Sequence, residues 1–144
     1  MVDRDIVFEK INQIQNCLKR IHSKVSSPDT LDDLDIQDIV VLNLQRAIQS
    51  TIDLAAHVVR DESLGLPKDL RENFILLEKG NIITSEISQK LQHMVGFRNI
   101  AIHEYSDMEL PILKKIISDH LGDFEDFYIQ VLKCFGILPP SEGL

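Results

Sequence analysis

The 144-residue chain has few cysteines and no long hydrophobic run. Its two cysteines, Cys17 and Cys134, show no spacing typical of a metal clip or of a disulfide framework. No signal peptide is evident, so we expect a protein of the reducing cytoplasm. No stretch approaches the roughly 18 consecutive apolar residues that form a membrane-spanning helix, and no membrane association is expected.

Basic residues are also in short supply. Lys and Arg number 15 against 23 Asp and Glu, which gives a formal net charge of -8. A surface of this charge repels nucleic acid as a whole, although a local basic cleft is compatible with it. A chain of this length can bury about two-thirds of its unfolded surface, so it needs no metal or disulfide to fold. We expect one helical domain over residues 1–135 and a flexible tail over residues 136–144.

Apolar residues recur every three or four positions along most of the chain, which predicts helices. The clearest stripe runs from Val7 to Val25. Further helices are expected at about 35–60, at about 68–79 with Gly80 as the stop, from Thr84 or Ser85 onward, and continuously from Pro111 through Leu132. No segment alternates convincingly like a strand. The sequence therefore predicts an all-α, up-and-down four-helix bundle with one additional short helix, and apolar positions on more than one face suggest a dimer.

One charged residue interrupts the apolar stripe of the fourth predicted helix. Arg98 falls in line with Ile87, Leu91, Met94, Ile102 and Tyr105 at roughly 100° per residue. A guanidinium in that place is costly unless it is paired or faces a cleft. One interpretation is an arginine whose side chain extends to the solvent at the edge of the core, or which pairs with a structural carboxylate. The other is a functional cation, and the neighbours Asn99, His103 and Tyr105 favour it because they add an amide, an imidazole and a phenol.

The second predicted helix carries a polar face formed by Asn43, Arg46, Ser50, Asp53 and His57. For Asn43 and Ser50 we expect a solvated surface. For Arg46 and Asp53 the alternative is a supporting role, in which they orient or neutralise the polar groups of the fourth helix.

Several other chemistries find no support in the sequence. The Glu-x-x-His pairs of di-iron bundles, the His-Glu-x-x-His motif, the phosphate-binding glycine loops and the Gly-x-Ser-x-Gly elbow are all absent. The five histidines are scattered without metal-ligand spacing. Neither a bound metal nor a cofactor is expected.

The segment from Met94 to Tyr105 resembles the signature of HEPN-domain proteins of the HepT toxin family. The family motif is an Arg, four residues, a His, one residue and a Tyr, and here these are Arg98, His103 and Tyr105, with the common Asn at position 99. The second helix and the run Gly65-Leu66-Pro67 also resemble the family. The resemblance covers about residues 5–133 and shows no departure within the motif. The acidic total charge is its least expected feature.

The resemblance implies the toxin of a type VII-like toxin–antitoxin system, a metal-independent endoribonuclease that cuts RNA, with tRNA often the target. It implies a symmetric homodimer whose motif residues line a cleft at the interface. It also implies an antitoxin partner, a minimal nucleotidyltransferase that silences the toxin by transferring AMP onto Tyr105. In this interpretation Arg98 and His103 are catalytic, while Asn99, Arg46 and Asp53 support them.

Two alternatives stay open at the level of the sequence. The chain could be a non-catalytic HEPN dimer that binds nucleotide or RNA, or that scaffolds the nucleotidyltransferase. Such a protein needs Arg98 and Tyr105 but not His103 as an acid–base group. A plain structural helical dimer is the other alternative, and it needs none of the three.

Overall fold

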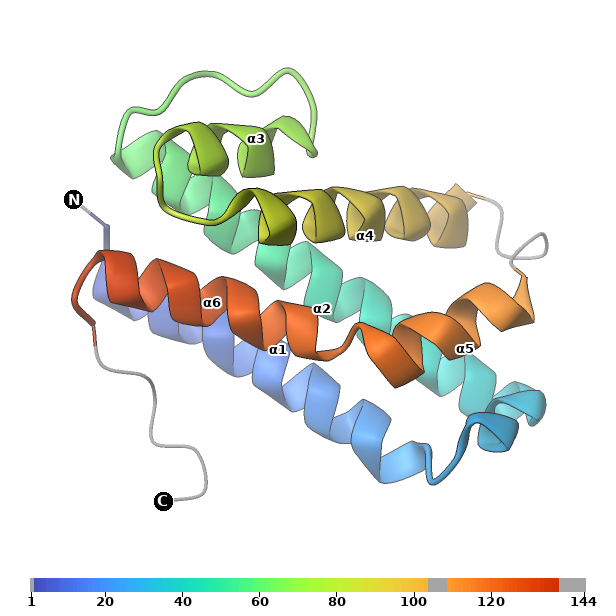
Figure 1. Cartoon of the computed structure of the whole chain (residues 1–144). Coiled ribbons are helices and arrows are strands. Elements are labelled where there is room, and N and C mark those ends of the chain that lie inside the picture. Colours follow the sequence, from blue (N-terminus) through green and yellow to red (C-terminus); the bar gives the residue numbers. More distant parts are fainter. Residues whose placement is uncertain (1, 104–108, 138–144) are drawn as a thin grey trace.

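The computed structural model describes residues 2–103 and 109–137, without the side chains of residues 102 and 103. The described part is all-helical, as predicted. Its elements are α1 (Arg4–Lys24), the 3-10 helix η1 (Pro28–Asp32), α2 (Leu34–Asp61), the short α3 (Glu72–Lys79), α4 (Ser85–His103), α5 (Leu110–Asp119) and α6 (Gly122–Cys134). The long elements run up and down beside one another, and α3 lies across the start of α4 (Figure 1).

Polar caps explain where several of these helices begin. The Asp3 carboxylate accepts the backbone N–H of Asp5 at 2.9 Å and so caps α1. In the same way the Asp33 carboxylate accepts the N–H of Asp35 at 2.8 Å at the start of α2. Thr84 caps α4, as predicted, because its hydroxyl accepts the N–H of Ile87 at 3.3 Å. Caps of this kind satisfy N–H groups that the first helical turn leaves without a partner.

Two predicted helix boundaries were wrong. The helix expected from about residue 68 begins at Glu72. The Asp69 carboxylate accepts the N–H of Glu72 at 2.9 Å, so Asp69 lies in the turn before the helix. The last helix, expected to be continuous, is two helices that meet at His120 and Leu121. There the His120 ring lies 3.0 Å from the carboxylate of Asp123 in the first turn of α6, and Gly122 has a low helix propensity.

The core lies between α1, α2, α4 and α6. The rings of Phe74 and Phe127 meet edge to face with centroids 5.7 Å apart, and both are fully buried. Each buried aromatic ring contributes about 2–3 kcal/mol through the removal of apolar surface from water. One buried polar contact joins α1 to α6, where the Gln15 amide donates to the Tyr128 hydroxyl at 3.2 Å.

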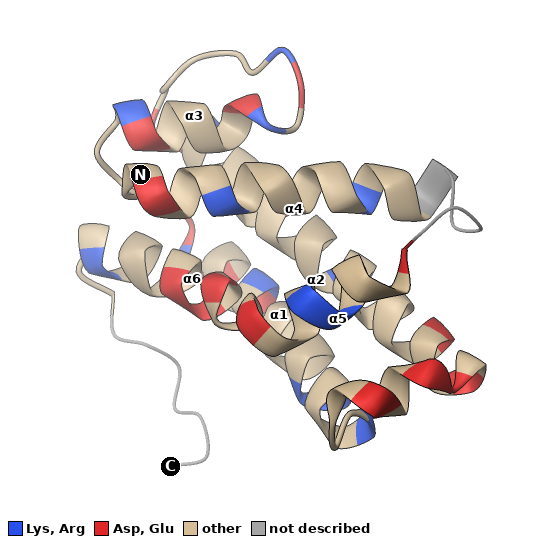
Figure 2. Ribbon diagram, turned by 45° about the vertical axis from the view of Figure 1, so that its right-hand side comes forward, with Lys and Arg blue, Asp and Glu red and all other residues tan. Residues whose placement is uncertain are grey.

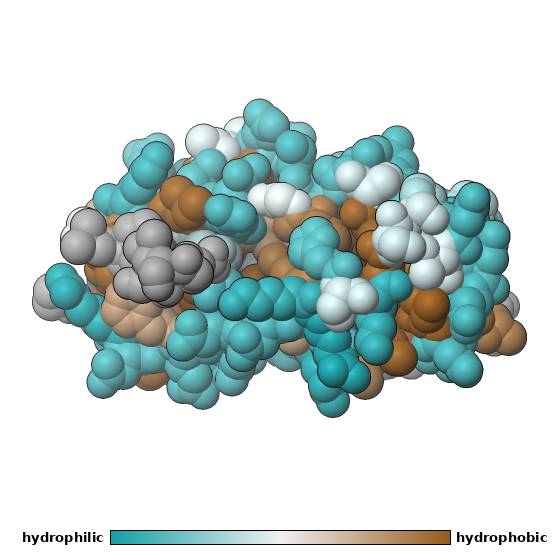
Figure 3. Space-filling model, turned by 90° about the horizontal axis from the view of Figure 1, so that it is seen from below, coloured by the Kyte–Doolittle hydropathy of each residue, from teal (hydrophilic) through white to brown (hydrophobic). Residues whose placement is uncertain are grey.

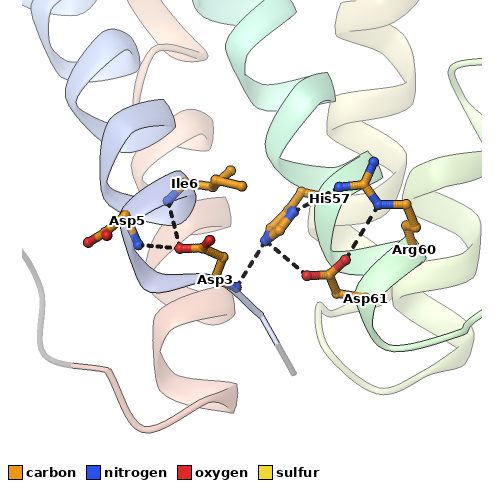
Figure 4. A network of polar contacts seen from close by, with 6 residues as sticks. All are labelled: Asp3, Asp5, Ile6, His57, Arg60 and Asp61. Atoms are coloured by element: carbon orange, nitrogen blue, oxygen red, sulfur yellow. Dashed lines mark hydrogen bonds and ion pairs between the residues drawn. The ribbon is translucent and has the colours of Figure 1, made fainter.

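The beginning of the chain is tied to the end of α2 through His57 (Figure 4). This buried ring accepts the backbone N–H of Asp3 at 3.1 Å and lies 3.4 Å from the Asp61 carboxylate. A guanidinium nitrogen of Arg60 lies 3.4 Å from its other ring nitrogen. The sequence placed His57 on a polar face; in the structure it fastens α1 against α2.

The surface is mostly hydrophilic, with apolar patches between the polar side chains on the face seen from below (Figure 3). Acidic residues crowd around η1 and the first turns of α2 (Figure 2). Over residues 2–103 and 109–137, no helix combines the length and the apolar character that crossing a membrane requires.

Candidate active site

The site is built around Arg98, which α4 directs toward the side of α2. Its Nη2 donates to the Gln49 side-chain oxygen at 2.6 Å, and its Nη1 donates to the Asn99 side-chain oxygen at 3.3 Å. The side chain is partly buried. Buried guanidinium groups need such partners because the loss of hydration is otherwise uncompensated. Arg98 is therefore held in place by two neutral amides and not by a carboxylate, which was one of the two structural alternatives.

A polar chain continues from Arg98 across α2 to α1. The Gln49 amide nitrogen donates to an Asp53 carboxylate oxygen at 2.8 Å, and the other Asp53 oxygen lies 3.6 Å from Nζ of Lys10. Gln49 thus turns its oxygen to the cation and its nitrogen to the anion, which fixes the orientation of its side chain. Asp53 acts on Arg98 through this amide, without touching it.

Gln49 is the residue that sequence analysis missed. It is neutral, and helical glutamines are usually solvated, so nothing in its type set it apart. A usable signal was its spacing, because Arg46, Gln49 and Asp53 follow one another at steps of three and four and so share one face of α2. That face, and not an isolated carboxylate, receives Arg98.

Arg46 lies in a hollow next to this chain of contacts. The hollow measures about 380 Å³ and is lined by Arg46, Gln49 and Asp53 of α2 together with residues of α1, Cys17 among them. Arg46 is exposed, and among the described residues it forms no hydrogen bond with Arg98. Burial raises the pKa of the Cys17 thiol, while the charge of Arg46 opposes this rise. Arg46 therefore contributes positive potential to the hollow.

The other predicted residues are placed only in part. Asn99 is exposed, and its side-chain oxygen accepts a hydrogen bond from Arg98. His103 is the last residue of α4, but its side chain is not described. Tyr105 lies outside the described residues. The predicted meeting of Arg98, His103 and Tyr105 thus stays a prediction.

The expected solvated surface at Asn43 and Ser50 was wrong. Both side chains are buried, with exposed fractions of 3% and 7%. The Asn43 amide donates to the Ile39 carbonyl at 2.9 Å, and the Ser50 hydroxyl donates to the Gln13 side-chain oxygen of α1 at 3.0 Å. The physical reason is that α1 packs against this side of α2, which leaves only the stripe from Arg46 to Asp53 toward the solvent.

The arrangement suits recognition of an anion. A guanidinium can offer two parallel N–H groups to a phosphate, and here it is preset on α4 by the hydrogen bonds that it donates to Gln49 and Asn99. In the part of the chain that the structure describes, no three His, Cys, Asp or Glu side chains gather as metal ligands would.

Comparison with known proteins identifies the family. Residues 8–131 match the family described as Ribonuclease HepT-like. The chain is 42% identical over 131 residues to a protein of Shewanella oneidensis named mRNA nuclease HepT, covering 90% of this chain and 98% of that protein. It is 31% identical over 136 residues to one of Aphanizomenon flos-aquae named tRNA nuclease HepT, covering 94% of this chain and 91% of that protein.

A solved structure agrees with this assignment. It is described as a tri-AMPylated HEPN toxin of Shewanella oneidensis in complex with the MNT antitoxin. It superposes with a TM-score of 0.86 at 40% identity and covers 90% of this chain and 98% of that chain. The match spans the helices that hold Arg98 and Gln49. The chain belongs to the HepT-like ribonuclease family.

Proposed function

We propose that the chain is the toxin of a toxin–antitoxin system and an endoribonuclease that cuts RNA without a metal ion. The observation that carries the proposal is Arg98, a partly buried guanidinium preset by Gln49 on the motif helix of a HepT-like ribonuclease chain. Relatives of this chain are named as nucleases of mRNA and of tRNA. Their different substrates support RNA as the common substrate class.

Cleavage would use the RNA's own 2′-hydroxyl. Its oxygen attacks the adjacent phosphorus and the bond from phosphorus to the 5′-oxygen breaks, which leaves a 2′,3′-cyclic phosphate and a 5′-hydroxyl. His103 would take the proton of the attacking hydroxyl or return one to the leaving oxygen, because an imidazole ordinarily titrates near neutrality. Arg98 would bind the phosphoryl oxygens as negative charge develops on them. Asn99 would hold His103 or the phosphate by a hydrogen bond, and Asp53 would act through Gln49.

A homodimer would complete this chemistry. One His per chain is few for a reaction that needs both a base and an acid, and a two-fold cleft would supply the second. The pairing would also double Arg98 and Arg46, which creates a local positive strip on an acidic protein.

Control of the toxin would come from a nucleotidyltransferase antitoxin. The phenol oxygen of Tyr105 would attack the α-phosphorus of ATP and release pyrophosphate, while the phenolic proton passes to a base of the transferase. The new phosphodiester anion would then lie near Arg98 and compete with the RNA phosphate. The complex of an AMPylated HEPN toxin with its antitoxin supports this part of the proposal.

Replacement of the imidazole tests the activity. His103→Ala should abolish RNA cleavage and growth arrest on expression, while helical content and melting temperature stay nearly unchanged. The matched control is His22→Ala, because His22 is an exposed histidine on α1 away from the site. An active His103→Ala chain would favour the non-catalytic dimer that binds RNA or scaffolds the antitoxin.

Replacement of the phenol tests the control. The chain is mixed with its nucleotidyltransferase antitoxin and ATP-Mg, and the added mass is mapped by mass spectrometry. Tyr105→Phe should keep much of its ribonuclease activity, accept no AMP and escape neutralisation. A mass that maps elsewhere would contradict the assignment of Tyr105.

A further inference from the structure

A second concave surface lies on the face of α4 next to the one that bears Arg98. This groove, of about 440 Å³, opens between α4 and α5 and reaches Arg71 just before α3. Its apolar part includes Phe97 and Ile100 of α4 and Ile112 of α5. Ile100 and Ile112 are each 47% exposed, which is unusual for large apolar side chains that face one another across a groove. The volume falls in the range of ligand-binding clefts.

The rim of the groove is basic although the chain as a whole is acidic. Arg71, Lys90 and Lys115 line it, and Figure 2 shows basic positions on α4 and α5. The single carboxylate in the lining, Asp123, is buried and already contacts Lys90 at 3.8 Å and the His120 ring at 3.0 Å. Lys90 also pairs with Glu86 at 3.0 Å.

The two remaining cations have no such partners. Within the described residues, neither the Arg71 guanidinium nor the Lys115 ammonium takes part in a hydrogen bond or ion pair. Both side chains are exposed. In a chain of net charge -8, carboxylates are plentiful, so two unpaired cations that flank one apolar groove indicate an anionic occupant.

Gly96 allows Arg71 to approach the backbone of α4 closely. A Cβ added to Gly96 would lie 2.7 Å from Nη2 of Arg71, so the guanidinium rests directly against the backbone of α4. Glycine inside a helix costs about 1 kcal/mol relative to alanine, and the close approach of Arg71 gives this glycine a physical reason. The groove is thus shaped around its cation.

From this geometry we propose that the groove binds RNA away from the cut site, with Arg71 and Lys115 on phosphates and a base against Ile100 and Ile112. This inference rests on the proposed ribonuclease function. Single-stranded RNA combines spaced negative charges with flat bases, and proteins bind it through basic grooves that follow its backbone. The two exposed isoleucines offer an apolar contact to a base in place of an aromatic ring. Phe97 and Arg98 are adjacent on α4, so the groove lies roughly a third of a turn around the helix from the site. One strand can therefore contact both.

A paired substitution tests the groove. Arg71→Gln and Lys115→Gln are combined in the full chain, with and without His103→Ala, which prevents cutting during binding measurements. Binding of a fluorescein-labelled single-stranded RNA is followed by anisotropy. Affinity should fall by about tenfold or more, and the dependence of log affinity on log salt should become shallower by about one unit. For long RNA, the paired substitution should raise KM more than it lowers kcat. Cleavage of a minimal dinucleotide should stay unchanged.

The control is the pair Lys19→Gln and Arg20→Gln on α1. These exposed residues give the same change in charge away from the groove, and they should leave affinity within about twofold, as expected for cations that touch no phosphate. A groove pair that behaves like this control overturns the proposal.

Gly96→Ala gives an independent test without any change in charge. The added methyl group should displace the flexible end of Arg71 while the helix keeps or gains stability. Gly96→Ala should lower RNA affinity by the same factor as Arg71→Gln alone. A chain that carries both substitutions should bind RNA no more weakly than either single variant. An alanine variant with unchanged affinity would contradict the role of Arg71.

The outcomes separate this proposal from the proposed function. If the wild-type chain cuts RNA and the Arg71→Gln, Lys115→Gln variant binds RNA normally, only the groove proposal is overturned. If the wild-type chain cuts no RNA, the proposed function is overturned. If the groove pair binds RNA normally but loses the antitoxin or dissociates into monomers, the groove is a protein interface and the proposal is wrong.

Discussion

Arg98 shows how a charged residue can occupy the apolar stripe of a helix without a carboxylate beside it. Two amide oxygens, from Gln49 and Asn99, accept from its guanidinium. We expect Arg98→Lys to lower kcat/KM by at least about tenfold, or ~1.4 kcal/mol of transition-state stabilisation. A single ammonium cannot hold both amides and still offer a planar pair of donors. Single-turnover cleavage measures the loss, and a fully active lysine variant would mean that charge alone matters.

Gln49 carries the influence of Asp53 to Arg98, so its removal should loosen the cation. Gln49→Leu is expected to lower cleavage about tenfold, the effect of losing one charge-assisted hydrogen bond of about 1.5 kcal/mol. Gln45→Leu is the matched control one turn earlier on α2, because the Gln45 side chain forms no hydrogen bond within the described residues. Cleavage and thermal unfolding are measured on both variants. Equal activity of the two would remove Gln49 from the site.

Cys17 reports on the electrostatics of the neighbouring hollow. Burial raises the pKa of its thiol and Arg46 lowers it, so Arg46→Gln should raise that pKa further. A higher pKa leaves less thiolate at a given pH, and the curve of alkylation rate against pH should shift upward. Iodoacetamide labelling followed by mass spectrometry measures the rates, with exposed Cys134 as the internal reference. Faster labelling of Cys17 in the variant would contradict this electrostatic account.

At the scale of elements, periodicity predicted the helices well and their interruptions poorly. The start of α4 at Thr84 and the extents of α1 and α2 follow from apolar spacing and capping residues. The break between α5 and α6 does not, because apolar residues continue across it at helical spacing. Apolar spacing does not register the local features that mark it, which are the contact of the His120 ring with Asp123 three residues later and the low helix propensity of Gly122.

For the candidate site, the sequence singled out some of the residues that meet in the structure and missed others. Arg98 stood out because charge in an apolar stripe is costly, and Asp53 because it shares a helix face with Arg46. Gln49 could not be identified, since its importance comes from packing between α2 and α4 and not from its residue type. Asn43 and Ser50 were misjudged for the same reason, because the packing of α1 decides which side of α2 is solvated.

Substitutions at two glycines distinguish the effect of backbone conformation on stability from the effect of side-chain packing. An added Cβ would meet nothing within 4 Å at either Gly122 or Gly136, but Gly136 has a φ of 63°. Gly122→Ala should therefore stabilise the protein by about 0.4–1 kcal/mol through lower entropy of the unfolded chain. Gly136→Ala should destabilise it by about 1 kcal/mol because alanine is strained in the left-handed region. Urea unfolding measures both, and equal effects would refute the backbone argument.

At the scale of the whole molecule, charge is segregated, so the net value is a poor guide to binding. Acidic residues gather around η1 and the start of α2 (Figure 2). Arg46 and Arg98 beside Gln49 of α2, and Arg71 and Lys115 at the groove between α4 and α5, are local exceptions. A polyanion guided to these surfaces and repelled elsewhere would be oriented before it is bound.

The exposed face of α2 that bears Arg46, Gln49 and Asp53 indicates where the predicted dimer would pair. Leu42 lies at its end, 45% exposed, in helical register with Arg46, Gln49 and Asp53. A partner that covered this face would bury the leucine and bring a second Arg98 toward the first. We therefore expect light scattering to give twice the mass of the 16.5 kDa chain. Leu42→Asp should shift it to monomer and lower cleavage together, because burial of a carboxylate against an apolar partner is costly.

Leu66→Asp is the control for this prediction, because Leu66 is 92% exposed in a loop away from the stripe. That variant should remain a dimer with normal cleavage. Both variants should melt near the wild-type temperature at concentrations below dimer formation, since neither leucine is buried in the isolated chain. A wild-type monomer of full activity would contradict the dimer. A Leu42→Asp dimer of full activity would place the interface elsewhere, and the second imidazole would then have to come from a different face of α4.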